Sequence, residues 1–251
     1  MERSFLNKKK IICIIQCRLG STRFKKKSIK KLGNYTILEW VIRRVKLSKK
    51  INVTYLATTK KREDNKLVTL AKKLKIKVYR GSVNDVFSRF YQISEKEMPD
   101  FIIRVCADNP FIMPSEIDNL IDFALKRKAD YSFNHIPYKN NNYIDGLGAE
   151  CLSFSLLKKL DKIKKNSHEK EHVTMHIWKN KKNFKFRYFL AKGNSRDNQR
   201  DIRLDIDYEF QYQKFKKLLK SYKKKPEDFN VYKLIKKIKK TKKDKKYISA
   251  N

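Results

Sequence analysis

The sequence predicts an α/β fold in which a mainly parallel β-sheet is flanked by helices. Three observations predict it. Short apolar runs alternate with segments of helical periodicity over the first 130 residues. Of the 251 residues, 40% are hydrophobic and 12% are aromatic, which is enough for a substantial core. With only 6 Gly and 5 Pro, the chain is neither collagen-like nor dominated by linkers.

The first predicted strand covers residues 11–17, and a helix follows it after a polar loop. The strand reads IICIIQC, a continuous apolar run typical of a strand buried on both faces. Thr36 and Glu39 have the T-x-x-E spacing of a capping box, in which each side chain accepts a hydrogen bond from the other residue's backbone N–H. Apolar residues then recur every four positions through 37–45, so this helix is expected to bury one face.

The alternation continues to about residue 130 and then loosens. The next predicted elements are a strand at 52–58, a helix at 63–74, a strand at 76–79, a helix at 84–95, a strand at 101–107 and a helix after Pro114. Such strand–helix–strand steps form right-handed crossovers between parallel strands. Further on we expect strands near 130–134 and 184–191, helices at 153–163 and 169–179, a strand ending at Asp207 and two lysine-rich helices.

The formal net charge is +37, and lysine is its source. The chain has 63 Lys and Arg against 26 Asp and Glu, and 49 of the basic residues are Lys. Phosphate-binding surfaces favour Arg, so drift towards lysine codons explains the excess more simply than a nucleic-acid surface does. Tyr222, Phe229 and Tyr232 lie among the C-terminal lysines at helical spacing, which core packing also explains. A basic nucleic-acid-binding protein is the alternative hypothesis.

Cysteine spacing and hydropathy indicate the class of protein. The four cysteines have no C-x-x-C spacing, which argues against a disulfide framework or a zinc ribbon. The early apolar run 11–15 is too short for a signal sequence or a membrane span. We therefore expect a soluble cytoplasmic protein.

The loop after the first strand has the composition of a polyphosphate site. Gly20 and its small polar neighbours offer backbone N–H groups, and Arg18, Arg23 and the lysines at 25–27 offer positive charge. The G-x-x-x-x-G-K-[ST] spacing of a Walker A loop is absent. From spacing alone, a solvated basic loop explains these residues equally well.

Carboxylates follow two of the later strands. Asp108 ends the strand at 101–107 in front of an Asn-Pro turn, and Asp205 and Asp207 are two residues apart on the last predicted strand. Carboxylates spaced in this way on a strand point to the same side, so both could reach one Mg²⁺ ion, while Leu204 and Ile206 would face the core. An ordinary Asp turn and a polar strand face are the alternatives.

The segment 168–172 matches the H-E-x-x-H pattern of zinc proteases. On one helix, His168, His172 and His176 would share a face. No third ligand follows at the metzincin spacing, and so short a pattern arises easily in a Glu- and Lys-rich helix. We therefore expect His172 to lie in a substrate pocket or an interface.

Several of these segments together resemble the acylneuraminate and spore-coat (SpsF-like) cytidylyltransferases. The resemblance extends over about residues 10–215. It rests, in chain order, on QCRLGSTRFKKKSI with LEWVIRRV, ATT with Glu63-Asp64, YRGSVNDVFSRF, RVCADNPFI, Glu150 after GLGA, EHVT at 171–174 and RLDIDYEFQY at 203–212. Each segment alone is weak, whereas the opening loop, R-x-x-x-D-x-P and D-x-D together are specific.

The resemblance implies a Rossmann-like nucleotide-diphospho-sugar transferase fold and a CTP-dependent reaction. The implied product is a CMP-sugar, made with release of pyrophosphate from an acidic sugar for cell-surface polysaccharide. By similarity, the residues that bind the triphosphate are Arg18, Gly20, Ser21, Arg23 and Lys27, and those near the nucleotide are Arg80, Ser82, Asp85 and Asp108. The resemblance implies that Mg²⁺ is bound by Asp108, Asp205 and Asp207, and that the catalytic residues are Arg18, Lys27 and Asp207. It places Arg104, Glu150 and His172 near the sugar.

The resemblance also implies an organisation. Residues 1–240 form one domain, residues of about 135–180 form an insertion that reaches a partner subunit in a homodimer, and 241–251 form a basic tail. Lys25-Lys26 replaces the family's Pro-Gly, which changes the backbone freedom of the turn but leaves Lys27 in register. The D-x-D segment is closer to the sialate branch and EHVT to the SpsF-like branch. A nucleotidyltransferase of different base or sugar specificity is therefore a further alternative.

Overall fold

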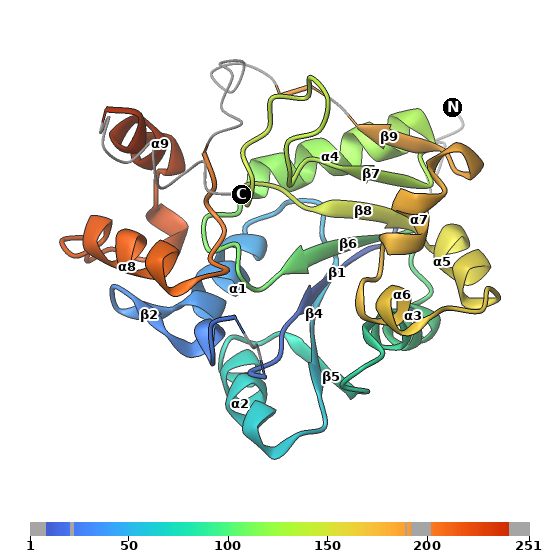
Figure 1. The fold of residues 1–251 in the computed structure, drawn as a ribbon, viewed down its shortest axis with the longest axis horizontal. Coiled ribbons are helices and arrows are strands. Elements are labelled where there is room, and N and C mark those ends of the chain that lie inside the picture. The colour runs from blue at the N-terminus through green and yellow to red at the C-terminus, as the bar shows by residue number, and fades with distance from the viewer. Residues whose placement is uncertain (1–8, 21–22, 189, 192–201, 241–251) are drawn as a thin grey trace, which may run out of the picture.

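A seven-stranded sheet is the centre of the protein (Figure 1). The structure, a computed structural model, describes residues 9–20, 23–188, 190–191 and 202–240. The strand order is β5-β4-β1-β6-β8-β7-β9, and only β8 runs against its neighbours. The strands are β1 (Ile11–Gln16), β4 (Val53–Thr59), β5 (Lys77–Gly81), β6 (Phe101–Cys106), β7 (Tyr131–Phe133), β8 (Glu150–Ser153) and β9 (Phe186–Tyr188).

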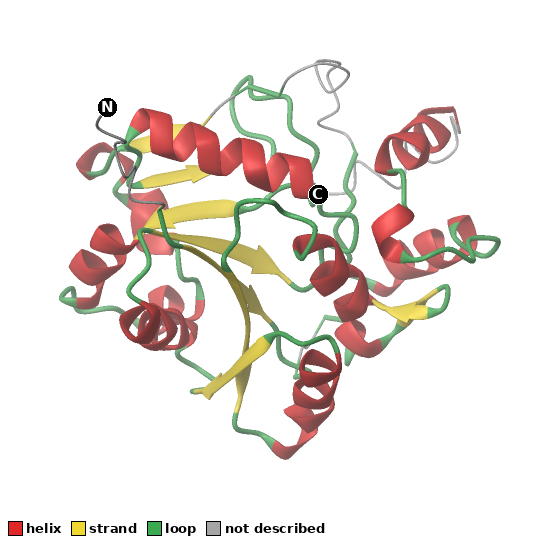
Figure 2. Cartoon of the chain, turned by 180° about the vertical axis from the view of Figure 1, so that it is seen from behind, coloured by secondary structure: helices red, strands yellow, loops and turns green. Residues whose placement is uncertain are grey.

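Helices cover both faces of this sheet, as the alternating pattern predicts. One face packs against α1 (Ile37–Val45), α2 (Asn65–Lys73) and α4 (Pro114–Arg127). In Figure 2, α4 lies in front of the sheet. The other face packs against α3 (Val86–Glu97), α5 (Phe154–Asp161) and α7 (Met175–Lys179). The mainly parallel α/β fold is therefore confirmed.

Strand β1 is central because its successive side chains pack alternately into the cores on the two faces of the sheet. Ile11, Cys13 and Ile15 face the α1–α2–α4 layer, whereas Ile12 and Ile14 face the α3–α5 layer. All five are at most 3% exposed, so the strand has no polar face. This double burial explains why its sequence is continuously apolar rather than alternating.

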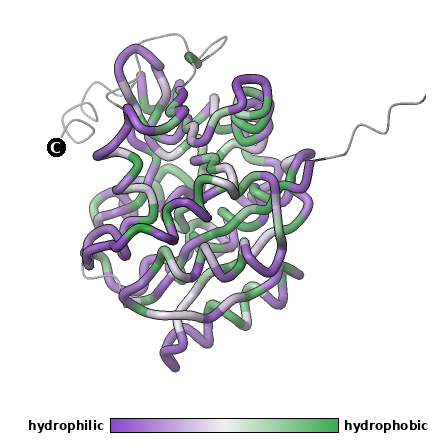
Figure 3. Tube along the Cα trace, turned by 90° about the vertical axis from the view of Figure 1, so that its right-hand side faces the viewer, coloured by the Kyte–Doolittle hydropathy of each residue, from purple (hydrophilic) through white to green (hydrophobic). Residues whose placement is uncertain are grey.

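The lysine-rich C-terminal helices belong to the fold. Helices α8 (Glu209–Leu218) and α9 (Val231–Lys240) pack with the hairpin of β2 (Lys31–Leu32) and β3 (Tyr35–Thr36) around Trp40. Tyr222 and Phe229 lie against the Trp40 ring, with ring centroids 5.9 and 5.2 Å away. Core packing thus accounts for these two aromatics. Hydrophilic and hydrophobic stretches alternate along the coloured part of the trace in Figure 3. The predicted basic tail, 241–251, lies outside the described residues.

Two short elements differ from the sequence prediction. The expected helix over 169–179 is two helices, α6 (Ser167–Glu171) and α7, because the backbone leaves the helical region at His172. The expected strand ending at Asp207 is wrong. The described residues 202–207 form one isolated bridge, Asp145 to Arg203, so no ladder forms.

Part of the segment 135–180 lies inside the sheet. Strand β8 was not anticipated, and it pairs antiparallel with both β6 and β7. The helix expected at 153–163 follows it directly as α5. The predicted contact of this segment with a partner subunit stays a prediction.

The strand order also identifies the edge where a ligand site is expected. From β1 the chain moves outward to β4 and β5, then crosses back to β6 on the other side of β1. In open α/β sheets, ligands bind outside the carboxyl ends of the strands where the order reverses in this way. That point lies between β1 and β6.

Candidate active site

A pocket of about 540 Å³ opens at this reversal point, and we call it the switch-point pocket. The loops after β1 and β6, the start of α3 and the end of α6 form its wall. The lining residues are Gln16, Cys17, Arg18, Arg23, Lys27, Ser28, Val86, Arg89, Cys106, Ala107, Asp108, Glu171 and His172. Four of them, three Arg and one Lys, carry positive charge against the two carboxylates of Asp108 and Glu171, and this positive balance suits an anionic ligand.

The loop after β1 is fastened to the sheet by a buried carboxylate. Asp64, 1% exposed, accepts a hydrogen bond from the N–H of Leu19 at 2.8 Å and one from the hydroxyl of Thr59. The loop closes on itself where the N–H of Lys26 donates to the Leu19 carbonyl at 3.3 Å. The exposed Gly20 lies at the tip between these contacts. The loop is therefore positioned before any ligand arrives.

Each arginine of the loop already forms an ion pair with a carboxylate. Arg18 donates to Glu171 Oε1 at 2.7 Å and to the Val83 carbonyl at 3.1 Å. Arg23 Nη1 lies 3.1 Å from Asp207 Oδ2, and its side chain is 56% exposed. Both guanidiniums border the switch-point pocket, so an anion bound there could replace these acids. Ser21 lies outside the described residues.

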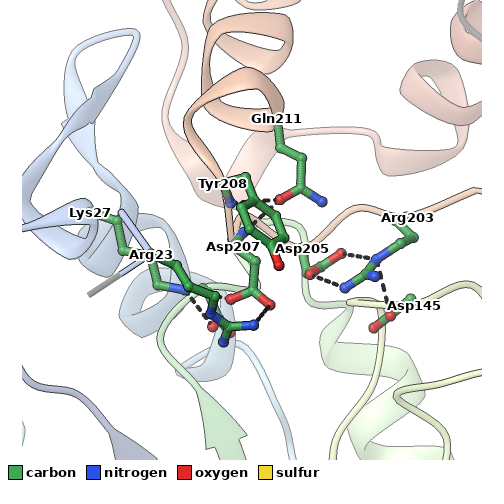
Figure 4. Close-up of polar contacts among 9 residues, drawn as sticks. Arg23, Lys27, Asp145, Arg203, Asp205, Asp207, Tyr208 and Gln211 are labelled. Atoms are coloured by element: carbon green, nitrogen blue, oxygen red, sulfur yellow. Dashed lines mark hydrogen bonds and ion pairs between the residues drawn. The ribbon is translucent and has the colours of Figure 1, made fainter. Parts of the chain in front are cut away.

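Lys27 lies between two carboxylates from distant parts of the chain (Figure 4). Its Nζ is 2.8 Å from Asp108 Oδ2 and 2.8 Å from Asp207 Oδ1. Burial lowers the pKa of the Lys27 ammonium, but Asp108 and Asp207 more than offset this, so the net shift is upward. Lys27 is therefore fully protonated at neutral pH.

Asp108 and Asp207 have the donor set of a divalent-cation site. Their oxygens converge on one cationic atom, the Lys27 nitrogen, and a hard cation prefers such oxygens. In the part of the chain that the structure describes, no group of three or more His, Cys, Asp or Glu could hold a metal ion. Two carboxylates fit Mg²⁺, which typically takes one or two of them and completes its shell with water and substrate phosphates.

Asp205 points away from this pair. Its carboxylate accepts two hydrogen bonds from Arg203, at 3.0 and 2.7 Å, and Arg203 also lies 3.4 Å from Asp145. Figure 4 shows two separate groups, Asp207 with Lys27 and Arg23, and Asp205 with Arg203 and Asp145. Asp205 and Asp207 therefore have different partners in this structure, and a shared role of the two in binding Mg²⁺ stays a prediction. Leu204 and Ile206 do face the core, each 0% exposed.

Comparisons with known proteins identify the family. The model of the family described as Cytidylyltransferase matches residues 12–244. The chain belongs to the cytidylyltransferase family. Its spore coat polysaccharide biosynthesis relative SpsF from Bacillus subtilis is 30% identical over 223 residues, 86% of this chain and 89% of SpsF. This cytidylyltransferase is therefore a nucleotidyltransferase enzyme, as the resemblance implies.

Solved structures support the same assignment. A cytidylyltransferase from Leptospira borgpetersenii superposes with a TM-score of 0.82 at 30% identity, covering 94% of this chain and 96% of that one. A CMP:2-keto-3-deoxy-manno-octonic acid synthetase complexed with CTP superposes with a TM-score of 0.63 at 15% identity, covering 84% and 99%. The second match shows the fold alone. The Rossmann-like nucleotidyltransferase fold is confirmed.

Arg80, Ser82 and Asp85 surround the start of α3 in this cytidylyltransferase and make local contacts. Arg80 donates to the carbonyls of Thr59 and Lys61, both at 2.9 Å. The Ser82 hydroxyl accepts from the N–H of Asp85 at 3.1 Å, and Asp85 caps α3. Their described contacts hold the loops beside the switch-point pocket, and their role near the nucleotide stays a prediction.

The partly buried Arg104 and the buried Glu150 form an ion pair next to Gln16, a residue that lines the switch-point pocket. Glu150, 2% exposed, accepts hydrogen bonds from Arg104, from the Tyr131 hydroxyl and from Thr174 Oγ1 at 2.9 Å. Arg104 also donates to Gln16 Oε1 at 3.1 Å, and Gln16 lines the switch-point pocket. The pair therefore positions the wall of the cytidylyltransferase pocket, and its contact with the sugar stays a prediction.

His172 lines the switch-point pocket, and the H-E-x-x-H pattern does not form a zinc helix. Helix α6 ends at Glu171, so His172 lies outside it. His176 Nδ1 instead lies 3.1 Å from Glu169. Burial, followed by the neighbouring His168, lowers the pKa of His172. His172 is therefore largely neutral at pH 7.

The sequence analysis missed two pocket residues of the cytidylyltransferase, Arg89 and Glu171. Both lie in segments that carry the resemblance, YRGSVNDVFSRF and EHVT, and neither was assigned a role. Contact with Arg18 reveals Glu171, and burial without an acidic partner reveals Arg89.

In the described part of the chain, no helix combines the length and apolar character needed to cross a membrane.

Proposed function

We propose that this enzyme transfers the cytidylyl group of CTP to an acidic sugar and releases pyrophosphate. The observation that carries the proposal is Lys27, held between Asp108 and Asp207 in the switch-point pocket beside Arg18 and Arg23. Paired carboxylates suit a divalent cation, and the cations suit a triphosphate. Family membership supports cytidine as the base.

The choice of an acidic sugar has separate support. The synthetase that shares this fold is named for 2-keto-3-deoxy-manno-octonic acid and was solved with CTP. SpsF is named for spore coat polysaccharide biosynthesis, so we assign the product to surface polysaccharide. The excess of positive charge at the switch-point pocket also favours a substrate that carries a carboxylate.

In the proposed reaction, the anomeric hydroxyl of the sugar attacks the α-phosphorus of CTP in line. Arg18, Arg23 and Lys27 neutralise the charge that develops on the α-phosphate and the departing pyrophosphate. Asp108 and Asp207 would hold Mg²⁺. When bound, the metal supplies Lewis-acid polarisation of the phosphoryl oxygens.

A pyrophosphate-release assay tests the proposal. The purified enzyme is given each of the four nucleoside triphosphates with a panel of ulosonic acids and of neutral sugars, with Mg²⁺ present. We expect release only with CTP and an acidic sugar. Turnover with UTP would change the base assignment, and turnover with neutral sugars alone would change the sugar class. No release with any pair would reject the proposal.

Two further expectations belong to the same enzyme. We propose a homodimer, which light scattering on the purified protein tests directly. We also propose that nucleic acid is not its specific partner, because two of the three aromatics that suggested one, Tyr222 and Phe229, pack against Trp40, whereas Tyr232 is 40% exposed. Residual binding to single strands should fall steeply as salt is raised, as it does for non-specific contacts with phosphates.

A further inference from the structure

Arg89 is a buried arginine in the wall of the switch-point pocket with no acidic partner. Its side chain is 2% exposed, and Nη1 donates to the Ala57 carbonyl at 3.2 Å. Its Nε is buried without a hydrogen-bond partner. Among the described residues, no carboxylate lies within ion-pair distance of Arg89. Burial, followed by the nearby Arg18, lowers the pKa of this guanidinium, and Asp64 and Asp85, which lie beyond ion-pair distance, offset this only in part.

A second buried arginine shows what a purely structural guanidinium looks like in this protein. Arg44, 3% exposed, donates through Nε to the Ile112 carbonyl at 2.7 Å. Its Nη1 donates to the carbonyls of Pro226 and Phe229, at 2.8 and 3.1 Å. Arg44 therefore joins three segments of the chain. Among the described residues Arg89 donates one such bond, through Nη1, and its buried Nε donates none.

The backbone nevertheless leaves room for Arg89. A Cβ added to Gly81 would lie 2.6 Å from Arg89 Cγ and 3.3 Å from Arg89 Cδ. Any larger residue at position 81 would therefore displace the stem of Arg89. Burying a charge without a partner destabilises a fold. Because this structure nevertheless keeps space for the Arg89 guanidinium, the partner of Arg89 is expected to be a ligand.

The register of the sheet shows which end of the ligand Arg89 would meet. Gln16, at the end of β1, is aligned with Ala57 on one side and Cys106 on the other. Arg89 binds the Ala57 carbonyl on the β4 side, whereas Asp108 follows β6 on the opposite side. Adjacent strands lie about 4.8 Å apart, so the two ends of the pocket are separated by about two strand spacings. A nucleotide with its phosphates at Lys27 would place its base near Arg89.

We propose that Arg89 binds the pyrimidine base and selects cytosine over uracil. Cytosine presents two adjacent acceptors, O2 and N3, which match two parallel N–H donors of a guanidinium. Uracil carries a hydrogen on N3, which would face the same donors and be rejected. The inference rests on the proposed use of CTP and adds the residue that determines the base.

Calorimetry with CTP, UTP and inorganic pyrophosphate tests this assignment on the whole chain. For Arg89→Met we expect affinity for CTP to fall about tenfold or more, with little change for UTP and pyrophosphate. The melting temperature should stay the same or rise, because an unpartnered buried charge is removed. Arg44→Met is the matched control, since it should melt earlier but keep the preference of the wild type for CTP.

Each other outcome is decisive. An equal loss for CTP, UTP and pyrophosphate would make Arg89 a phosphate ligand and overturn the base assignment. Unchanged CTP affinity with a lower melting temperature would make it structural and also overturn it. If Arg89→Met does not fold, Arg89→Lys keeps the charge but not the paired donors, and the same loss of preference is expected. A wild-type protein that binds no nucleotide would reject the proposed function together with the inference.

Discussion

The Nζ of Lys27 lies 2.8 Å from Oδ1 of Asp207, although 180 residues separate them in the chain. If Asp207 holds the metal with Asp108, Asp207→Asn should keep the fold, because the amide has the same shape. Activity should fall by about 100-fold or more, since the change removes one charge from the site of phosphoryl transfer. Steady-state pyrophosphate release measures this, and raising Mg²⁺ should restore part of the loss.

Asp118→Asn provides the control for that experiment. Asp118 lies on α4 and accepts a hydrogen bond from the N–H of Lys49 at 3.1 Å, away from the switch-point pocket. Its replacement should leave turnover unchanged. Full activity of Asp207→Asn at low millimolar Mg²⁺, combined with loss of activity and metal content in His172→Ala, would reopen the zinc interpretation of the H-E-x-x-H segment.

Asp205→Asn should affect stability more than catalysis. Asp205 is 5% exposed and accepts two hydrogen bonds from Arg203, so the substitution removes the negative charge and one of the two acceptor oxygens, and leaves Arg203 with one hydrogen bond here and the contact to Asp145 at 3.4 Å. We expect a loss of about 1–2 kcal/mol in the free energy of unfolding, since Arg203 is partly exposed. Urea denaturation measures it. A loss of turnover as large as that of Asp207→Asn would show that Asp205 moves into the metal site.

Glu171→Gln should tighten the binding of CTP. The carboxylate of Glu171 holds Arg18 at 2.7 Å, and the two side chains are 47% and 33% exposed. Removing its charge frees Arg18 for a phosphate, and a surface pair of this kind corresponds to a gain of at most about fivefold. Calorimetry at low and high salt measures it, and the gain should shrink as salt screens the pair. Glu95→Gln, on the exposed side of α3, should change nothing. Weaker binding would mean that Glu171 itself supports the nucleotide.

Lys26→Gly should stabilise the protein. Lys26 has φ 56° and ψ 26°, a left-handed conformation that favours glycine, and it occupies the position of the family's glycine in the resemblance. A side chain in this conformation costs about 1 kcal/mol, which the glycine removes. Thermal unfolding should show a higher melting temperature for Lys26→Gly, whereas Lys25→Gly, which lacks a positive φ, should gain nothing. A lower melting temperature for Lys26→Gly would show that the lysine side chain makes compensating contacts.

The sequence predicts what depends on local periodicity. The strands and helices from β1 to α4 follow from apolar spacing, and the capping box of Thr36 and Glu39 forms as expected. Strand β8 is four residues long and is held by pairing with β6 and β7, so no local pattern reveals it. The end of α6 at Glu171 likewise depends on packing, since the residues that follow continue a helical pattern.

The sequence could predict which residues belong to the site, but not which residues they contact. The loop of Arg18 and Lys27 and the carboxylates of Asp108 and Asp207 are visible in the sequence, and the structure brings Lys27, Asp108 and Asp207 together. The capture of Asp205 by Arg203 could not be predicted, because alternation along an assumed strand placed its carboxylate beside that of Asp207. Arg89 is equally hidden, since its burial depends on the space that Gly81 leaves.

Glu97→Gln should destabilise the protein at neutral pH and not at low pH. Hydrogen bonds from Lys77, Tyr55 and Lys10 lower the pKa of Glu97 from 4.5 to about 2. Because the folded-state pKa lies below the unfolded value, this stabilisation is fully present above about pH 4.5 and is lost as the pH falls to about 2. Urea denaturation from pH 2 to pH 7 should therefore show a difference between wild type and variant that vanishes at the acid end. Glu95→Gln should show no such trend, and a constant difference at all pH values would attribute the effect to packing.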